Sequence, residues 1–203
     1  MAVKINEKRS RRLDADLLTT REIEALMRVC SRRAPIGVRN RAIIALAWRS
    51  GLRIGEVLAL QVKDVDLEAG TVVVLHGKGD KRRVVGLDAG TRTLLERWLA
   101  LRHKRGLACV RLIFCTLQGG PIDSSYIRHL LPRLARRAGI TKRVHAHGLR
   151  HAFAVGLERE GATVSLIRDL LGHSSAAVTD RYLRRLGGGE AVEFVQRREW
   201  PTP

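Results

Sequence analysis

Six side chains in this sequence have the types that phosphate chemistry without a metal requires. Such chemistry needs cations that clamp the non-bridging oxygens, a nucleophile, and an acid for the leaving oxygen. Arg53 in SGLRIGE and Arg150 in HGLRH stand in the expected first turns of helices, where the helix dipole also favours an anion. Lys78 stands between glycines in the expected hairpin turn HGKGDK, His173 falls at a helix break in LLGHSS, and Tyr182 follows nine residues later.

The sixth side chain, His147, stands three residues before Arg150, so we expect both to project from one face of the same helix. His151 lies one turn after His147 and is expected to have a structural, hydrogen-bonding role. The spacing of these two histidines could also indicate zinc, but the glutamate of an HExxH motif is missing and no third ligand is indicated. We therefore expect no metal and no other cofactor.

Each of these residues also has a plainer interpretation. A single arginine in a chain so rich in arginine could be a surface charge, and Lys78 could be an ordinary exposed turn lysine. Tyr182 shares a helix face with Val178 and Leu186, so a core tyrosine is the alternative for it. The one other tyrosine in the sequence, Tyr126, falls among leucines and isoleucine in an expected helix and is expected to be a packing residue.

The charge of the chain points to a polyanionic partner. Lys and Arg number 38 against 20 Asp and Glu, which gives a formal net charge of +18. Such an excess repels itself in the folded state and is usually tolerated because a polyanion neutralises it. Nucleic acid is the first candidate partner and an anionic membrane surface the second, while a merely solvated basic surface is the alternative. Aromatic residues make up 4%, too few for the base-stacking surfaces typical of RNA binders.

Length and composition indicate one soluble domain. The 203 residues, 45% of them hydrophobic, are enough for one well-buried core. Cys30, Cys109 and Cys115 lack the CxxC spacing of metal sites and are expected to be reduced thiols in a cytoplasmic protein. The start, MAVKINEKRSRR, is too charged for a signal peptide, and apolar runs such as residues 42–48 are far too short to span a bilayer.

The elements that must position the candidate residues are mainly helical. A capping box, Thr19 with Glu22 three residues later, opens a first helix over EIEALMRVC. Gly51 is expected to end a second helix, and Gly172 to cap the C-terminus of another. Apolar residues at helical spacing predict helices over 40–50, from Arg53 through IGEVLAL, and over 91–105, 126–138, 147–160 and 163–171.

One stretch of the chain changes period. Between positions 62 and 87 the runs VDL, TVVVLH and RRVVGL are separated by EAG and GKGDK, which predicts a small antiparallel sheet with tight turns. Further on, Ser174 or Ser175 is expected to cap the helix that holds Tyr182, and the glycines at 187–189 are expected to form a flexible joint. We therefore predict a mainly α fold with one small antiparallel β-sheet, an α+β class.

In sequence order, GLRIGE, GKGDKRRVVGL, HAHGLRHAF, LLGHSS and then Tyr182 resemble the motifs of the tyrosine recombinase or phage integrase family, Xer-like in character. The combination of HxLRH, LGH and a tyrosine nine residues later is highly specific. The resemblance implies the catalytic-domain fold of that family over residues 19–186. Residues 1–18 are then expected to be a linker or N-terminal arm, and residues 187–203 a glycine joint with a C-terminal docking segment.

The resemblance also implies a reaction, the cleavage and rejoining of duplex DNA through a 3′-phosphotyrosyl intermediate with neither metal nor ATP. It assigns Tyr182 as the nucleophile and His147 as the acid/base partner of its phenol. Lys78 protonates the departing 5′ oxygen, and His173 adds a hydrogen bond to a non-bridging oxygen. It makes Arg53 and Arg150 the clamp on the scissile phosphate, with Glu56, at the acidic position one turn after Arg53, in a supporting role.

The sequence departs from the usual form of the family at its start. Most members carry a separate helical core-binding domain before this one, and we expect that domain to be absent here, so that DNA binding is weak and salt-sensitive. Family members often dock a C-terminal helix onto a neighbouring protomer, and Ala191, Val192, Phe194 and Val195 could form such a face. The sequence favours neither this docking nor the alternative, in which the tail folds back in cis or is disordered without DNA. We expect a homotetramer on DNA, with a monomer in isolation as the alternative.

Two other functions remain open from the sequence. The same chemistry could give topoisomerase-like nicking and resealing, if a lone domain cleaves without bringing two duplexes together. A non-catalytic DNA-binding or regulatory module is the alternative from another class, although every expected catalytic side chain is present. The target DNA sequence depends on groove contacts and DNA deformability that no motif reports.

Overall fold

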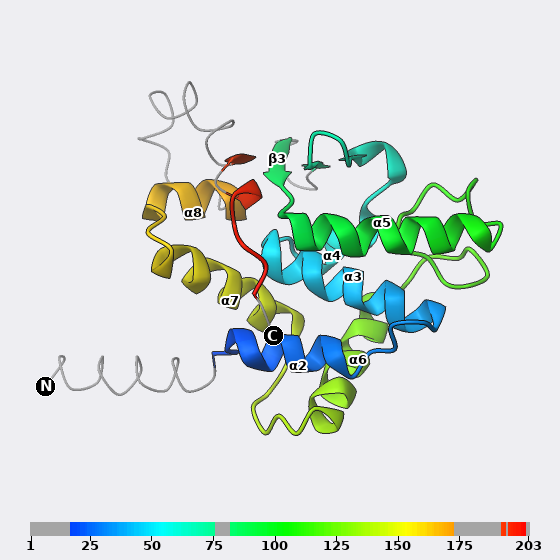
Figure 1. The fold of residues 1–203 in the computed structure, drawn as a ribbon, viewed down its shortest axis with the longest axis horizontal. Helices are drawn as coiled ribbons and strands as arrows, with labels where there is room; N and C mark the ends of the chain where they lie inside the picture. The colour runs from blue at the N-terminus through cyan, green and yellow to red at the C-terminus, as the bar shows by residue number, and fades with distance from the viewer. Residues whose placement is uncertain (1–16, 76–81, 173–191, 194, 202–203) are drawn as a thin grey trace, which may run out of the picture.

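The computed structural model describes residues 17–75, 82–172, 192–193 and 195–201, in which helices surround a central helix and carry one small sheet (Figure 1). The helical elements, in chain order, are α2 (Thr20–Arg28), α3 (Pro35–Arg49), α4 (Ile54–Ala59), the short 3₁₀ turn η1 (Val62–Asp64), α5 (Ala89–Lys104), α6 (Ser124–Arg137), α7 (Ala146–Arg159) and α8 (Val164–Leu171). The strands are β1 (Val65–Asp66), β2 (Thr71–Val74) and β3 (Arg83–Gly86). The predicted fold class, mainly α with a small antiparallel sheet, is confirmed.

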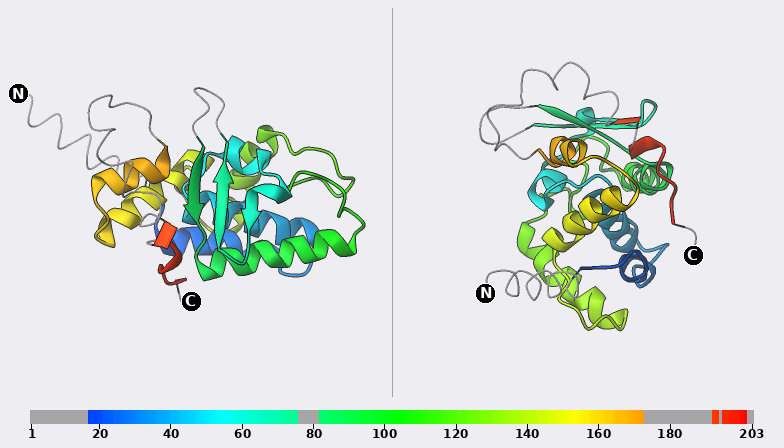
Figure 2. Two further views of the ribbon diagram at one scale, coloured as in Figure 1. Left: turned by 90° about the horizontal axis from the view of Figure 1, so that it is seen from above. Right: turned by 90° about the vertical axis from the view of Figure 1, so that its left-hand side faces the viewer.

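The sheet is antiparallel throughout and has the order β1-β2-β3. Val72 pairs with Val85 in this register, and both side chains are buried, as is that of Val74. Figure 2 shows the sheet along one side of the helical body, so the buried valines alternate with residues on the outer face. The connection 76–81, which contains Lys78, lies outside the described residues.

Helix α3 is the centre of the fold. It packs against α5, α7, α4 and α2, and nearly all of its residues from Gly37 onward are buried. A helix that is buried all round has no polar face to reveal its period, and its ends must be recognised by other signals. The helix begins at Pro35 and not at residue 40 as predicted, because proline suits the first position of a helix, where its missing N–H is not needed.

Helix caps confirm several of the predicted boundaries. The side chains of Thr19 and Glu22 form both halves of the capping box at the start of α2. Gly172 ends α8 with φ 62°, a left-handed conformation that favours glycine. Helix α7 begins at Ala146, with His145 as its N-cap, which places Arg150 at the fifth helical residue; the prediction of a first-turn position was wrong by about one residue.

The described part of the C-terminal segment packs against its own chain. Val195 is fully buried, and Trp200 makes an edge-to-face contact with Trp48, their ring centroids 5.9 Å apart. Arg198 donates two hydrogen bonds to the carboxylate of Glu160, of 2.6 and 2.8 Å. The segment, red in Figure 1, therefore lies in cis in this structure. Of the predicted docking residues, Ala191 lies outside the described residues, as does Phe194.

A buried ion pair at the start of α5 makes Asp88 important for stability. Its carboxylate accepts a hydrogen bond of 2.5 Å from Nε of buried Arg49 and another of 2.8 Å from the backbone N–H of Thr91, and it is 0% exposed. We expect Asp88→Ala to lower the free energy of unfolding by about 3–5 kcal/mol, because it leaves a buried guanidinium without its counter-charge and removes a helix cap. Urea denaturation of the two proteins measures this difference.

The matched control for this prediction is Asp123→Ala. Asp123 is the exposed N-cap of α6, and its carboxylate accepts a hydrogen bond from the backbone N–H of Ser125 at 2.7 Å. It should cost much less than the change at Asp88. Equal losses for the two variants would show that the buried pair adds nothing beyond capping.

Candidate active site

Arg150 connects two distant segments of the chain at the centre of the site. Its Nη1 donates to the carbonyl oxygen of Gly51 and its Nη2 to that of Leu171, both at 2.5 Å. Gly51 has φ 62°, and a Cβ there would lie 2.4 Å from the ring of Phe153, so only glycine fits this turn. The arginine, 4% exposed, is thus held in one orientation between the start of α4 and the end of α8.

The carboxylate of Glu56 joins Arg53 to Arg83. Its Oε2 accepts from the backbone N–H of Arg53 at 2.7 Å and its Oε1 from Nη1 of the same residue at 3.0 Å. Arg83 approaches the two oxygens in a parallel fork, with Nη1 to Oε1 at 3.0 Å and Nη2 to Oε2 at 2.7 Å. The side chains of Glu56 and Arg83 are 12% and 11% exposed, whereas that of Arg53 is 50% exposed.

Three guanidiniums therefore lie in electrostatic reach of one carboxylate. Burial, together with the charges of Arg53 and Arg83, lowers the pKa of Arg150 to about 10, against the opposing charge of Glu56. Arg150 remains charged at neutral pH, so the cluster keeps an excess of positive charge. Fixed, partly buried guanidiniums with that excess are suited to bind a dianionic or monoanionic phosphate group.

The carboxylate is held in its charged form by these partners. Burial alone would raise the pKa of Glu56, but the hydrogen bonds from Arg83 and from the backbone of Arg53, with the charge of Arg83, lower it to about 2. A carboxylate whose pKa is lower in the folded than in the unfolded chain stabilises the fold at pH values above its unfolded pKa. This contribution is lost as the pH falls from about 4.5 toward 2.

The variant Glu56→Gln tests this linkage. We expect it to lower the free energy of unfolding at pH 7 by about 3 kcal/mol, and the difference from wild type to shrink as the pH falls below about 4.5. Denaturant titrations of both proteins between pH 7 and pH 3 measure it. A difference that stays constant over this range would mean that the charge of Glu56 does not stabilise the fold.

The structure places some of the predicted site residues and leaves others outside the described residues. Arg53, Glu56 and Arg150 come together as described above. His147 is exposed on the first turn of α7, with its ring stacked 6.4 Å from that of His145. The side chain of His151 is exposed and makes no hydrogen bond within the described part of the chain, so its supporting role stays a prediction. The residues that lie outside the described residues are Lys78, His173 and Tyr182.

Arg83 is the residue that the sequence analysis missed. The sequence does carry a weak sign of this role. In RRVVGL, Arg83 and buried Val85 are two residues apart in a strand, so both side chains point to the face that packs on the helices. An arginine on that face needs an acidic partner. The sequence could not say that this partner is Glu56, which is 27 residues away.

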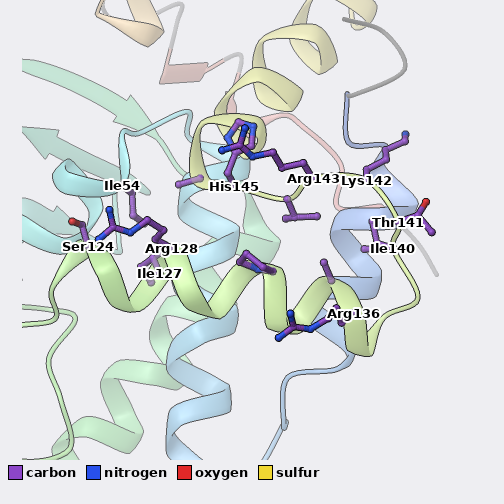
Figure 3. Close-up of a pocket in the computed structure, with 14 residues that line it drawn as sticks. Ile54, Ser124, Ile127, Arg128, Arg136, Ile140, Thr141, Lys142, Arg143 and His145 are labelled. Atoms are coloured by element: carbon purple, nitrogen blue, oxygen red, sulfur yellow. The ribbon is translucent and has the colours of Figure 1, made fainter. Parts of the chain in front are cut away.

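A pocket of about 520 Å³ opens between α6 and the segment that leads into α7 (Figure 3). Ile54, the residue after Arg53 in sequence, contributes to its wall. Four basic side chains line it, those of Arg128, Arg136, Lys142 and Arg143. The wall of the pocket is therefore basic.

No group of three or more His, Cys, Asp and Glu side chains could hold a metal ion within the part of the chain that is described. None of the helices among those residues has an apolar stretch long enough to cross a membrane.

The chain is similar in sequence to known proteins. The sequence model of the phage integrase family matches residues 16–186. Among curated proteins, the tyrosine recombinase XerC of Bacillus subtilis (strain 168) is 35% identical over 169 residues, which are 81% of this chain and 55% of that protein. The tyrosine recombinase XerD of Ralstonia nicotianae (strain ATCC BAA-1114 / GMI1000) is 37% identical over 81% of this chain and 54% of that protein.

Solved structures give the same result. The crystal structure of XerA recombinase matches with a TM-score of 0.69 and 32% identity, over 78% of this chain and 55% of that one. XerH site-specific recombinase, bound to its difH substrate in a pre-cleavage complex, matches with a TM-score of 0.67 and 32% identity. The match covers 79% of this chain and 47% of that one. The chain belongs to the phage integrase family, as its motifs predicted. It spans about half the length of the curated relatives it matches.

Proposed function

We propose that this chain is the catalytic domain of a tyrosine-type site-specific recombinase or integrase. It cleaves and rejoins duplex DNA through a 3′-phosphotyrosyl intermediate on Tyr182. The observation that carries the proposal is the cluster of Arg53, Arg83 and Arg150 about the single carboxylate of Glu56, which leaves fixed positive charge where a phosphodiester can bind. The family supports the same reaction, since the relatives it matches are tyrosine recombinases.

The proposed reaction exchanges one phosphate ester for another. The phenolic oxygen of Tyr182 attacks phosphorus, and the bond from phosphorus to the 5′ oxygen breaks, which leaves a 3′-phosphotyrosyl ester and a free 5′-hydroxyl. A phenol with a pKa near about 10 is a poor nucleophile at neutral pH. His147 therefore accepts its proton, and Lys78 donates one to the 5′ oxygen. Because the ester bond is conserved, a 5′-hydroxyl can reverse the step without ATP or a metal.

The arginines stabilise the transition state in this proposal. The equatorial oxygens of a pentavalent phosphorus gain negative charge, where preorganised guanidiniums are most effective. Arg150 is already oriented by two backbone carbonyls, and exposed Arg53 is oriented by Glu56. His173 adds a hydrogen bond to a non-bridging oxygen. Catalysis then needs little rearrangement of these cations when the phosphate binds.

The partners follow from charge and from the family. The net charge of +18 and the basic side chains of the pocket support duplex DNA as the substrate. We propose a homotetramer on two duplexes, in which residues 1–18 act as an arm, 19–186 as the catalytic domain and 187–203 as the joint and docking segment. A cytoplasmic location is part of the same proposal.

A covalent-adduct assay tests the reaction. A pool of duplexes with randomised sequence carries a nick just beyond the cleavage position, so that the short fragment with the 5′-hydroxyl diffuses away and the adduct is trapped. The upstream strand is labelled at its 5′ end. We expect a labelled band that survives denaturation and disappears after protease digestion. The chain is assayed alone and fused to a general duplex-binding domain, which raises the local DNA concentration; no adduct in either form would refute the proposal.

Binding to duplex DNA should be weak and should depend strongly on salt. We expect affinity to fall by roughly 10²- to 10³-fold between 50 and 200 mM salt, as when several phosphates are neutralised. The double variant Arg128→Glu, Arg143→Glu should bind more weakly and with a smaller salt slope. Filter-binding titrations measure both, and tight binding that salt does not change would contradict the electrostatic mode.

A further inference from the structure

Arg83 lies where three segments of the candidate site meet. It is the first residue of β3 and pairs in register with Val74 of β2. The connection 76–81, with Lys78 in its sequence, immediately precedes its neighbour Arg82. The first segment that Arg83 joins is therefore the pair of strands on either side of that connection.

The second segment is the start of α4. The fork of Arg83 occupies both oxygens of Glu56, at 3.0 and 2.7 Å. The same two oxygens hold the backbone N–H and Nη1 of Arg53. A shift of Arg83 would therefore move the carboxylate that orients Arg53.

The third segment is the end of α8. A Cβ built on Gly172 would lie 3.0 Å from Nη1 of Arg83 and 3.3 Å from its Cδ, so the arginine packs closely against this glycine. The preceding carbonyl, of Leu171, is the one that accepts from Arg150. The next residue in sequence is His173. Arg83 thus contacts the backbone next to a direct partner of Arg150.

The charge of Arg83 also reaches Arg150. After burial and the charge of Arg53, it is a further cause of the lowered pKa of Arg150, against the opposing effect of Glu56. The two guanidiniums are therefore close enough to repel one another, and the charge of Glu56 opposes that repulsion.

We propose that Arg83 is a positioning residue for strand cleavage: through Glu56 and Gly172 it sets the orientation of Arg53 and the end of α8 that holds Arg150. This inference rests on the proposed function. The role requires the planar fork of an arginine, because a lysine ammonium can hold only one carboxylate oxygen at a time in this geometry. Arg83 does not touch the phosphate in this assignment and acts only through its neighbours.

The test measures the single-turnover rate of adduct formation at saturating DNA, together with affinity for an uncut duplex. We expect Arg83→Lys and Arg83→Gln to lower the rate by about 10- to 100-fold, the scale that misplaced catalytic groups produce. Affinity should change by less than about threefold, because the phosphate-contacting side chains remain. In a Glu56→Gln background, Arg83→Gln should lower the rate by less than it does in wild type, since the connection through Glu56 is already broken and only the contact with Gly172 remains to be lost.

The control is Arg92→Lys, which changes the arginine of an exposed pair with Glu96 and should leave rate and affinity as in wild type. Thermal melts set an assay temperature at which each variant is folded; Arg83→Lys, which keeps charge, decides the outcome if Arg83→Gln does not fold. A wild-type rate for Arg83→Lys would overturn the inference, as would equal losses of rate and affinity. It would also be overturned if Arg83→Gln lowered the rate as much in the Glu56→Gln background as it does in wild type. No adduct from wild type would instead refute the proposed function itself.

Discussion

A chain in which Tyr182 is replaced by phenylalanine is expected to form no covalent adduct with DNA. The substitution removes only the phenolic oxygen, and a phenyl ring has no atom that can attack phosphorus. The arginines proposed to bind phosphate are unchanged, so affinity for an uncut duplex should stay within about twofold of wild type. The trapped-nick assay shows the first effect as a missing labelled band, and filter binding measures the second.

Tyr126→Phe is the matched control for this change. The hydroxyl of Tyr126 exchanges hydrogen bonds with the side-chain amide of Asn40, at 3.0 and 3.2 Å, as expected of a packing tyrosine. Losing them should cost about 1 kcal/mol of stability and leave the adduct yield unchanged. If Tyr182→Phe still gave the adduct, the nucleophile would have to be another residue and the assignment of Tyr182 would fail.

The second large effect is expected at Arg150. In Arg150→Lys a single ammonium cannot reach the carbonyl oxygens of both Gly51 and Leu171, which now accept from two separate nitrogens. One of these buried carbonyls loses its donor, and the phosphate loses a fork of N–H groups. We expect the rate of adduct formation at saturating DNA to fall by about 10²- to 10³-fold, the scale of losing one preorganised donor.

Stability separates the two consequences of this change. We expect Arg150→Lys to lower the free energy of unfolding by about 2 kcal/mol, because a buried acceptor is left unsatisfied. Arg39→Lys is the control: Arg39 is equally buried and donates to the carbonyl oxygen of Cys115 at 2.8 Å, but it takes no part in the cluster. It should destabilise the chain without slowing adduct formation. A normal rate for Arg150→Lys would exclude Arg150 from the reaction.

Arg150 shows how the fold and the site depend on the same contacts. Its two carbonyl acceptors lie 99 and 21 residues away in sequence, and the turn at Gly51 is closed by the ring of Phe153, from the same helix as Arg150. The guanidinium thus stabilises the junction of α4, α7 and α8 while it is held in place by that junction. Substitutions in this cluster should therefore affect both stability and reaction rate, and only a comparison of the two identifies the catalytic part.

The sequence by itself determined the features that depend on near neighbours. The capping box of Thr19 and Glu22, the left-handed cap at Gly172 and the three strands were predicted because each leaves a local pattern of side-chain type and period. The same holds for Arg53 at a helix start. The order of the motifs was enough to identify the family, although Lys78, His173 and Tyr182 keep their roles as predictions.

Only the tertiary structure decided which distant residues meet. The forks from Arg83 to Glu56 and from Arg198 to Glu160 span 27 and 38 residues, and no periodicity marks their partners. In a chain with 38 basic residues, any acid has many possible partners in sequence. The choice follows from how α4 packs on α3, how β3 meets the end of α8 and how the C-terminal segment contacts α3 and α7, because burial makes an unpaired charge costly and geometry leaves one partner within reach.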